Sequence, residues 1–289
     1  MMTKEEFILL TKKTVLLDGA TGSNLMAAGM PRGICTEQWV LEHPEVLLRL
    51  QEAYVEAGSR IIYAPTFGGN RKNLASHGLE KNIADINHRL VSLSQQASRG
   101  RALIAGDITT LGMLSPAGPL FYEEAFEIYR EQISFLKEAG VDLLVAETMI
   151  QLDETLAALD AAHDVCDLPV LCSMSVEADG SIFTGGNVIE ACAALESAGA
   201  DAVGLNCSVG PDQLVSVVRN ICETVSVPVL AKPNAGMPLI DEKGNAVYSM
   251  TAPEFGQHMA ALQKAGATLL GGCCGTTPEF IREVKKAIS

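Results

Sequence analysis

Short apolar runs alternate with longer amphipathic segments along the whole chain. The apolar runs, which are typical of buried β-strands, cover residues 15–18, 60–66, 102–108, 143–148, 169–176, 202–207, 228–234 and 269–273. Between them apolar residues recur at helical spacing, for example over 44–57, 81–98, 123–139, 152–165 and 253–265. Strands that alternate with helices are predicted to be parallel, and runs this apolar are expected to be buried on both faces.

This alternation predicts an α/β fold, a closed (β/α)8 TIM barrel formed by residues 1–289 as a single domain. An open doubly wound sheet is the alternative. An internal repeat supports the barrel, because Ala139-Gly140-Val141-Asp142 recurs as Ala198-Gly199-Ala200-Asp201, and 198 − 139 = 59. Pro169-Val170-Leu171 recurs at the same spacing as Pro228-Val229-Leu230. The chain therefore consists of repeated βα pairs.

Polar residues gather where the predicted strands end, which is where barrels of this kind carry their chemistry. The repeat aligns Thr148 with Cys207 (207 − 148 = 59), so Glu147 and Cys207 are expected at one level of the barrel, two strands apart. One such residue could simply cap a helix, but many at one rim indicate a site. The other strand-end residues are Asp18, Gly19, Ala20, Thr21, Thr66, Phe67, Asn206 and Asn234.

Two adjacent cysteines stand in a glycine-rich stretch, Gly271-Gly272-Cys273-Cys274-Gly275. Neighbouring side chains of a regular strand point to opposite faces, but flanking glycines let the backbone leave strand geometry. Both thiols could then reach one centre, and Cys207 would complete a three-thiolate site. Zinc fits such a site, because soft sulfur ligands select it and catalytic zinc keeps one position open.

Other interpretations of the cysteines remain open at this point. Free cysteine often fills space in a core, and the adjacent pair could form a strained vicinal disulfide. We expect the other five cysteines to be core or incidental thiols. They are Cys35, Cys166, Cys172, Cys192 and Cys222.

Composition and charge narrow the classes of function. The formal net charge of −14 argues against a nucleic-acid partner, because phosphate binding needs clustered Lys and Arg. No apolar run is long enough to span a membrane, and the first residues lack the pattern of a secretory leader. We therefore expect a cytoplasmic protein that binds neither nucleic acid nor membrane.

Four motifs together resemble the homocysteine S-methyltransferase family, and within it the N-terminal homocysteine-binding barrel of cobalamin-dependent methionine synthase. The likeness covers essentially the whole chain. Relatives that use S-methylmethionine usually carry arginine after the cysteine pair, where this chain has Gly275. The motifs are Asp18-Gly19-Ala20-Thr21-Gly22, Gly204-Leu205-Asn206-Cys207-Ser208, Pro233-Asn234-Ala235-Gly236 and Gly271-Gly272-Cys273-Cys274-Gly275-Thr276-Thr277-Pro278.

The resemblance implies roles for these residues. Cys207, Cys273 and Cys274 would bind one Zn²⁺ per chain, with the sulfur of homocysteine in the fourth position. Asp18 and Glu147 would hold the substrate ammonium, and the backbone of residues 19–21, Gly19, Ala20 and Thr21, would receive its carboxylate. Thr66, Phe67 and Asn206 would line the pocket, and Asn234 would be an oxygen ligand in the absence of substrate.

The hypothesis is a methyl transfer to homocysteine, activated as a zinc thiolate, to give methionine. The sequence lacks the Asp-x-His-x-x-Gly motif that holds cobalamin in the full enzyme. A methylated corrinoid (methylcobalamin) is therefore expected on a partner protein. The alternatives are an S-methylmethionine donor, a zinc-stabilised barrel subunit without activity of its own, and an unrelated aldolase-like enzyme that uses Lys232.

Overall fold

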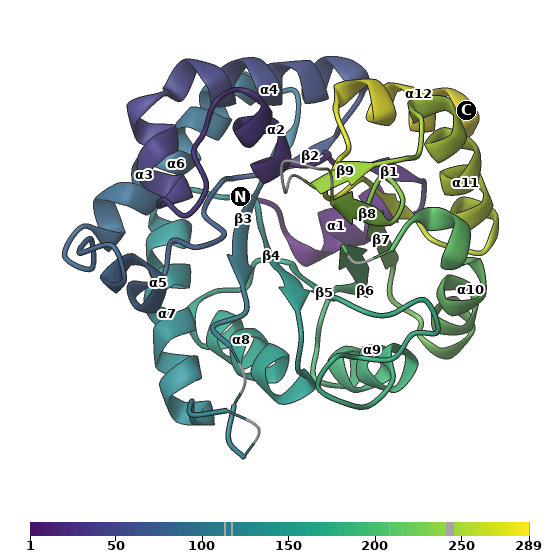
Figure 1. Ribbon diagram of the computed structural model, residues 1–289. Coiled ribbons are helices and arrows are strands. Elements are labelled where there is room, and N and C mark those ends of the chain that lie inside the picture. Colours follow the sequence, from purple (N-terminus) through teal and green to yellow (C-terminus); the bar gives the residue numbers. More distant parts are fainter. Residues whose placement is uncertain (113, 117, 208, 241–245, 289) are drawn as a thin grey trace.

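The chain folds into a TIM barrel with parallel strands inside and helices outside (Figure 1). The structure is a computed structural model that describes residues 1–112, 114–116, 118–207, 209–240 and 246–288. The barrel strands are β1 (Val15–Leu16), β2 (Ile61–Tyr63), β3 (Leu103–Thr109), β4 (Leu143–Met149), β5 (Val170–Met174), β6 (Ala202–Cys207), β7 (Val229–Pro233) and β10 (Leu269–Leu270).

The strands pair in the order β1-β10-β7-β6-β5-β4-β3-β2, and every pair in this sheet is parallel. At the seam between the two end strands, the backbone N–H of Arg60 donates to the carbonyl of Leu16 over 2.7 Å. This contact brings the first and second strands together. The open-sheet alternative is therefore wrong.

Helices surround the strands and join one strand to the next. A helix follows each barrel strand because parallel neighbours need a crossover connection. The helices are α1 (Lys4–Thr11), α2 (Gly22–Ala27), α3 (Thr36–Glu42), α4 (Pro44–Ala57), α5 (Arg71–Ala75), α6 (Ile83–Ser98), α7 (Tyr122–Glu138), α8 (Leu152–Val165), α9 (Val188–Ser197), α10 (Val215–Thr224), α11 (Ala252–Lys264) and α12 (Pro278–Ile288).

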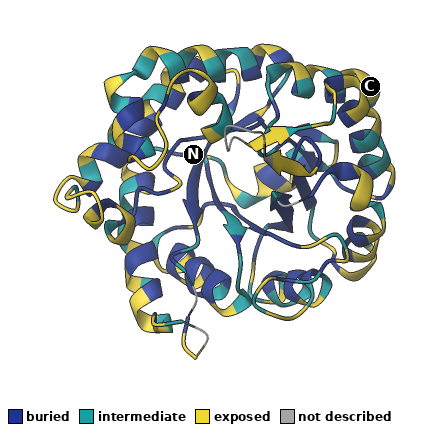
Figure 2. Ribbon diagram, viewed as in Figure 1, coloured by how far each residue is buried: buried dark blue, intermediate teal, exposed yellow. Residues whose placement is uncertain are grey.

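Two large clusters of buried side chains lie on the two faces of the sheet. Figure 2 shows the barrel strands largely in the colour of buried residues. The larger cluster lies between strands and helices. The smaller fills the barrel interior with alternate strand residues such as Leu143 and Val145, and Phe7 of α1 packs against it. The same alternation along β4 continues from Leu143 and Val145 to the polar residue Glu147. The polar site therefore lies at the end of the apolar barrel interior.

Several element boundaries differ from the prediction. The predicted helices 44–57 and 152–165 and the strand 202–207 are confirmed at both ends. The strands expected at 15–18, 60–66 and 269–273 are shorter, since the chain turns into loops after Leu16, Tyr63 and Leu270. An antiparallel hairpin, β8 (Pro238–Ile240) and β9 (Ala246–Tyr248), was not predicted. Among the described residues, no helix is both long and apolar enough to cross a membrane.

Candidate metal and substrate site

Three cysteines that are far apart in sequence meet at the carboxyl end of the barrel. The Sγ atoms of Cys207, Cys273 and Cys274 all lie within 4.8 Å of one another, and those of Cys207 and Cys274 are 4.0 Å apart. All three residues are partly buried. The structure thus brings together the cysteines that the sequence nominated as metal ligands.

The backbone of Cys207 turns its side chain toward the other two thiols. Asn206 and Cys207 end β6, where regular alternation would point them to opposite faces. Cys207 instead has φ +64, a left-handed conformation that non-glycine residues rarely adopt. Thr148, its counterpart in the 59-residue repeat, has φ +58. The repeat therefore extends to an unusual backbone turn at the end of both strands.

Glycines shape the turn that carries the other two cysteines. A Cβ at Gly271 would lie 2.7 Å from the carbonyl oxygen of Asp18, and one at Gly272 would lie 2.5 Å from Thr276 Oγ1. Only glycine leaves room for these approaches. The strand ends at Leu270, so Cys273 lies in the loop after the strand and Cys274 in the turn that follows. The backbone after Leu270 therefore agrees with the expectation that Cys273 and Cys274 do not have strand geometry.

Hydrogen bonds fix the cysteine turn to its neighbours. Thr276 Oγ1 donates to the carbonyl of Cys273 over 2.7 Å and accepts from the N–H of Ala20 over 3.0 Å. Asn206 Nδ2 lies 3.9 Å from Cys273 Sγ, and its Oδ1 accepts from Thr148 N and Ser173 Oγ, both over 2.8 Å. Hydrogen bonds of Thr276 and Asn206 thus hold the cysteine turn in place, as expected for a preformed site.

The three thiols fit a zinc ion. Zinc–sulfur bonds of about 2.3 Å in a tetrahedron place neighbouring sulfurs about 3.8 Å apart, close to the separation of Cys207 and Cys274. Hydrogen bonding with Cys207 raises the pKa of Cys273 well above its ordinary value and that of Cys274 to about 11, and burial adds to both shifts. A divalent cation would favour the thiolates that this packing otherwise disfavours.

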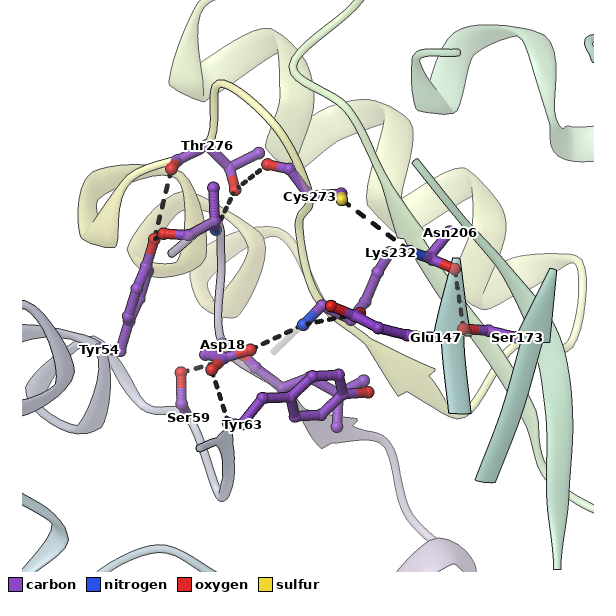
Figure 3. Close-up of polar contacts among 12 residues, drawn as sticks. Asp18, Tyr54, Ser59, Tyr63, Glu147, Ser173, Asn206, Lys232, Cys273 and Thr276 are labelled. Atoms are coloured by element: carbon purple, nitrogen blue, oxygen red, sulfur yellow. Dashed lines mark hydrogen bonds and ion pairs between the residues drawn. The ribbon is translucent and has the colours of Figure 1, made fainter. Parts of the chain in front are cut away.

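A second cluster of charged side chains lies inside the barrel beside the thiols (Figure 3). Lys232 Nζ lies 2.7 Å from Asp18 Oδ1 and 4.0 Å from Glu147 Oε2. The Nζ atom of Lys232 also lies 3.5 Å from the centre of the Tyr63 ring. The backbone N–H of Tyr63 donates to Asp18 Oδ2 over 2.8 Å. Lys232 and Asp18 are 3% and 1% exposed, so this ion pair is fully enclosed.

The protonated state of Lys232 follows from these contacts. Burial lowers its pKa, but the attraction of Asp18 and of Glu147 outweighs this and raises the pKa above its ordinary value. A lysine that forms a Schiff base needs an unprotonated amine. The aldolase-like alternative therefore has no support from the geometry of this side chain.

Asp107 on β3 is a further carboxylate in this cluster. Burial raises the pKa of Asp107 well above its ordinary value, and repulsion by Glu147 adds to the shift. Burial likewise raises the pKa of Glu147, although the attraction of Lys232 partly offsets it. Burial and this repulsion together favour a proton on one of the two carboxyl groups.

The thiols and the acids line one cavity of about 940 Å³. Of the residues predicted for the substrate, the loop after β1 and Phe67 also line it, and Phe67 is 38% exposed. The cavity is lined by the predicted metal ligands, by the Lys232–Asp18 ion pair and by the two carboxyl groups described above. The members named here are Asp18, Gly19, Ala20, Thr21, Phe67, Asp107, Glu147, Cys207, Lys232, Cys273 and Cys274.

Three residues predicted for the substrate lie behind the cavity wall. Thr66 is fully buried, and its Oγ1 donates to the carbonyl of Asp107 and accepts from the N–H of the same residue. Asn206 is fully buried and holds Thr148 and Cys273. Asn234 is 3% exposed. Thr66 and Asn206 thus support the site from behind. Ser208, part of one quoted motif, lies outside the described residues.

Sequence reasoning missed Asp107 and considered Lys232 only as the nucleophile of the aldolase-like alternative. Each is a charged residue in an otherwise apolar strand, which is rare unless the charge is paired. Asp107 also follows Ala105 at the two-residue spacing that faces the barrel interior. A charge in an apolar strand could have indicated both residues, and the spacing from Ala105 could have placed Asp107 on the side of the barrel interior.

Comparisons with known proteins agree with this geometry. The family model for homocysteine S-methyltransferase matches residues 15–288. Methionine synthases of Mycobacterium leprae and Mycobacterium tuberculosis are 30% and 29% identical over 305 and 299 residues, which cover 97% of this chain. The match covers 25% of each relative, so the chain spans about a quarter of their length.

A solved structure confirms the barrel fold. The metallated form of the homocysteine methyltransferase MmuM from Escherichia coli superimposes with a TM-score of 0.83 and 21% identity. The match covers 98% of this chain and 99% of that one.

Proposed function

The chain belongs to the homocysteine S-methyltransferase family, and on this premise we propose that it transfers a methyl group to the sulfur of homocysteine, giving methionine. One observation supports this most directly: three thiols meet in a cavity that is also lined by carboxylates. The thiols suit a metal, and the carboxylates suit the ammonium of an amino acid. We propose that residues 1–289 act as one homocysteine-binding domain.

Cys207, Cys273 and Cys274 are the proposed ligands of one zinc ion per chain. A free thiol ionises near pH 8.5, so homocysteine alone is mostly protonated and a weak nucleophile at neutral pH. Zinc held by the three cysteines would act as a Lewis acid and keep the substrate thiol deprotonated. The chain's own residues then orient the amino acid so that its sulfur faces the methyl donor.

The two ends of the amino acid would be held on different walls of the cavity. The acidic wall with Asp18 and Glu147 would attract the ammonium. The N–H of Ala20 already donates to Thr276 Oγ1, which leaves the carboxylate to Gly19 and Thr21. Phe67 would cover the substrate, whereas Thr66, Asn206 and Asn234 would act from behind the wall.

We propose a methylated corrinoid as the donor, bound outside residues 1–289 on a partner chain. The sulfur–carbon bond of methionine would form as the cobalt–carbon bond breaks, and the corrinoid would leave as cob(I)alamin. The similarity to methionine synthases supports this, as does the space around Gly275. Gly275 has φ +81, and a Cβ there would collide with the ring of Tyr248. The arginine that S-methylmethionine-dependent relatives carry at this position would not fit without rearrangement.

The cysteines also bear on where the protein works. Cys207, Cys273 and Cys274 must stay reduced to bind metal, and reducing conditions prevail in the cytosol. We therefore propose a cytoplasmic location. Four of the other five cysteines are buried and Cys222 is partly buried, and none of the five belongs to the three-thiol cluster.

A methyl-transfer assay tests the proposed function. The zinc-loaded chain is incubated with homocysteine and either methylcobalamin or S-methylmethionine, and methionine is measured. We expect methionine from methylcobalamin, loss of activity after chelation, and recovery when zinc is restored. Activity with S-methylmethionine but not with methylcobalamin would contradict the proposal of a corrinoid donor. A lack of methionine with both donors would favour the inactive-subunit alternative.

A further inference from the structure

Both oxygens of the Asp18 carboxylate already accept a hydrogen bond from within the protein. Its Oδ1 accepts from Lys232 over 2.7 Å, and its Oδ2 accepts from the N–H of Tyr63 over 2.8 Å. Asp18 is 1% exposed, and its charge is balanced by a lysine that is itself enclosed. A substrate ammonium placed against Asp18 would also stand close to the Lys232 ammonium. Cavity oxygens that have no partner are therefore better acceptors for its hydrogen bonds.

Two carboxyl oxygens in the same cavity have that capacity. Asp107 Oδ1 and Glu147 Oε2 are buried and have no hydrogen-bond partner among the described residues. Glu147 Oε2 lies 4.0 Å from Lys232 Nζ, which is beyond hydrogen-bond distance. A buried oxygen that loses water without gaining a partner costs free energy, and ligand sites often contain such atoms.

The two residues come from neighbouring strands and face the same space. In the pairing of β3 with β4, Thr109 lies opposite Glu147, and Asp107 is two residues earlier on the same face. Both residues line the cavity that contains the three thiols. A ligand with sulfur at the thiols and a cation at these acids would lie along one wall of this cavity.

The charges of the cluster also match a single ammonium. Lys232 and Asp18 neutralise each other. Asp107 and Glu147 are buried in the same cavity, and their mutual repulsion favours a proton on one of the two carboxyl groups. One negative charge is then left in the enclosed cluster, and the ammonium of one amino acid would balance it.

We infer that Asp107 is a substrate-binding residue whose Oδ1, together with Glu147 Oε2, accepts hydrogen bonds from the ammonium of homocysteine. Lys232 holds Asp18 in an internal ion pair, so Asp18 contributes to the acidic wall while Asp107 and Glu147 accept the hydrogen bonds of the ammonium. This inference rests on the proposed function, and it adds an ammonium-binding residue that the sequence motifs do not include.

The test compares two thiols that differ only in the ammonium group. Homocysteine and 4-mercaptobutyrate, which lacks the α-amino group, are titrated into the zinc-loaded protein by calorimetry. Asp107→Leu removes the oxygen, and Asp107→Asn keeps an oxygen at Oδ1. Asp167→Asn, at an exposed position before β5, is the control.

We expect wild type and the control to prefer homocysteine. Asp107→Leu should lose about tenfold or more in affinity for homocysteine and little for 4-mercaptobutyrate, with Asp107→Asn in between. Zinc content checks that each variant is folded. An unchanged preference in both Asp107 variants, or an equal loss for both thiols, would overturn the inference.

The control arms separate this inference from the proposed function. If zinc-loaded wild type binds neither thiol, the proposed function fails and the inference fails with it. If wild type prefers homocysteine and the Asp107 variants keep that preference, only the assignment of Asp107 is wrong.

Discussion

Asp107 illustrates a conflict between binding and stability at a single residue. An unfolded aspartate ionises near pH 3.9, whereas burial raises the pKa of Asp107 in the folded chain. The folded state therefore holds a proton that the unfolded state releases as the pH rises above about 4. The contribution of this group to stability is full below that pH and is lost as the pH rises toward the folded pKa.

Asp107→Asn should therefore stabilise the substrate-free protein at neutral pH. We predict a gain of roughly 0.5–2 kcal/mol in the free energy of unfolding at pH 7, because the amide carries no ionisation penalty. The gain should shrink as the pH falls toward 4. Urea denaturation at several pH values measures it, with Asp167→Asn as the control. An Asp107→Asn protein that is less stable than wild type at pH 7 would contradict the prediction.

The sequence identified the residues with distinctive patterns and missed those without one. Cys273 and Cys274 stand together between glycines, so their spacing alone suggested a shared centre. Lys232 was considered only as a nucleophile, because its ion pair with Asp18 joins positions 214 residues apart in sequence. Only the closed barrel brings those two positions together.

At the scale of elements, β6 and β7 pack too closely for a side chain at Gly204. A Cβ on Gly204 would collide with the backbone carbonyl of Leu230 on β7, and a backbone group cannot move aside as a side-chain end can. The two strands lead to Cys207 and Lys232, so this contact lies on strands that carry one residue of the metal cluster and one of the charge cluster. Glycine is required here by close approach, not by a turn.

Gly204→Ala should destabilise the protein by about 1–3 kcal/mol or more, because the strands would have to separate. Gly22→Ala is the matched control, because a Cβ at Gly22 meets nothing within 4 Å. Thermal or urea unfolding measures both variants. The prediction is wrong if Gly204→Ala is as stable as Gly22→Ala.

The order of the elements could be predicted from the sequence, but not all their ends. Buried runs such as 143–148 and 202–207 gave strands because only an enclosed sheet accommodates so many apolar residues in succession. The end of β10 was misplaced, since the backbone at Gly271 and Gly272 packs against and hydrogen-bonds to the carbonyl of Asp18, which is distant in sequence. The hairpin of β8 and β9 was missed because its strands have only three residues each and β9 is mostly exposed.

At the scale of the molecule, the barrel brings the site together from distant parts of the chain. Cys207 ends β6, and Cys273 and Cys274 follow β10, while the acids come from β3, β4 and the loop after β1 (Figure 1). Parallel strands all end at one rim, so residues at strand ends converge whatever their separation in sequence. The central claim is that this convergence creates a zinc site.

Metal content tests that claim most directly. Zinc per chain is measured by mass spectrometry for wild type, Cys207→Ala and Cys222→Ala after each is purified in reductant and dialysed with zinc. Cys222 is a partly buried thiol on α10 and outside the cluster. We predict one zinc in wild type and Cys222→Ala and a loss of nearly all zinc in Cys207→Ala. One tightly bound zinc in Cys207→Ala, or none in wild type, would contradict the account.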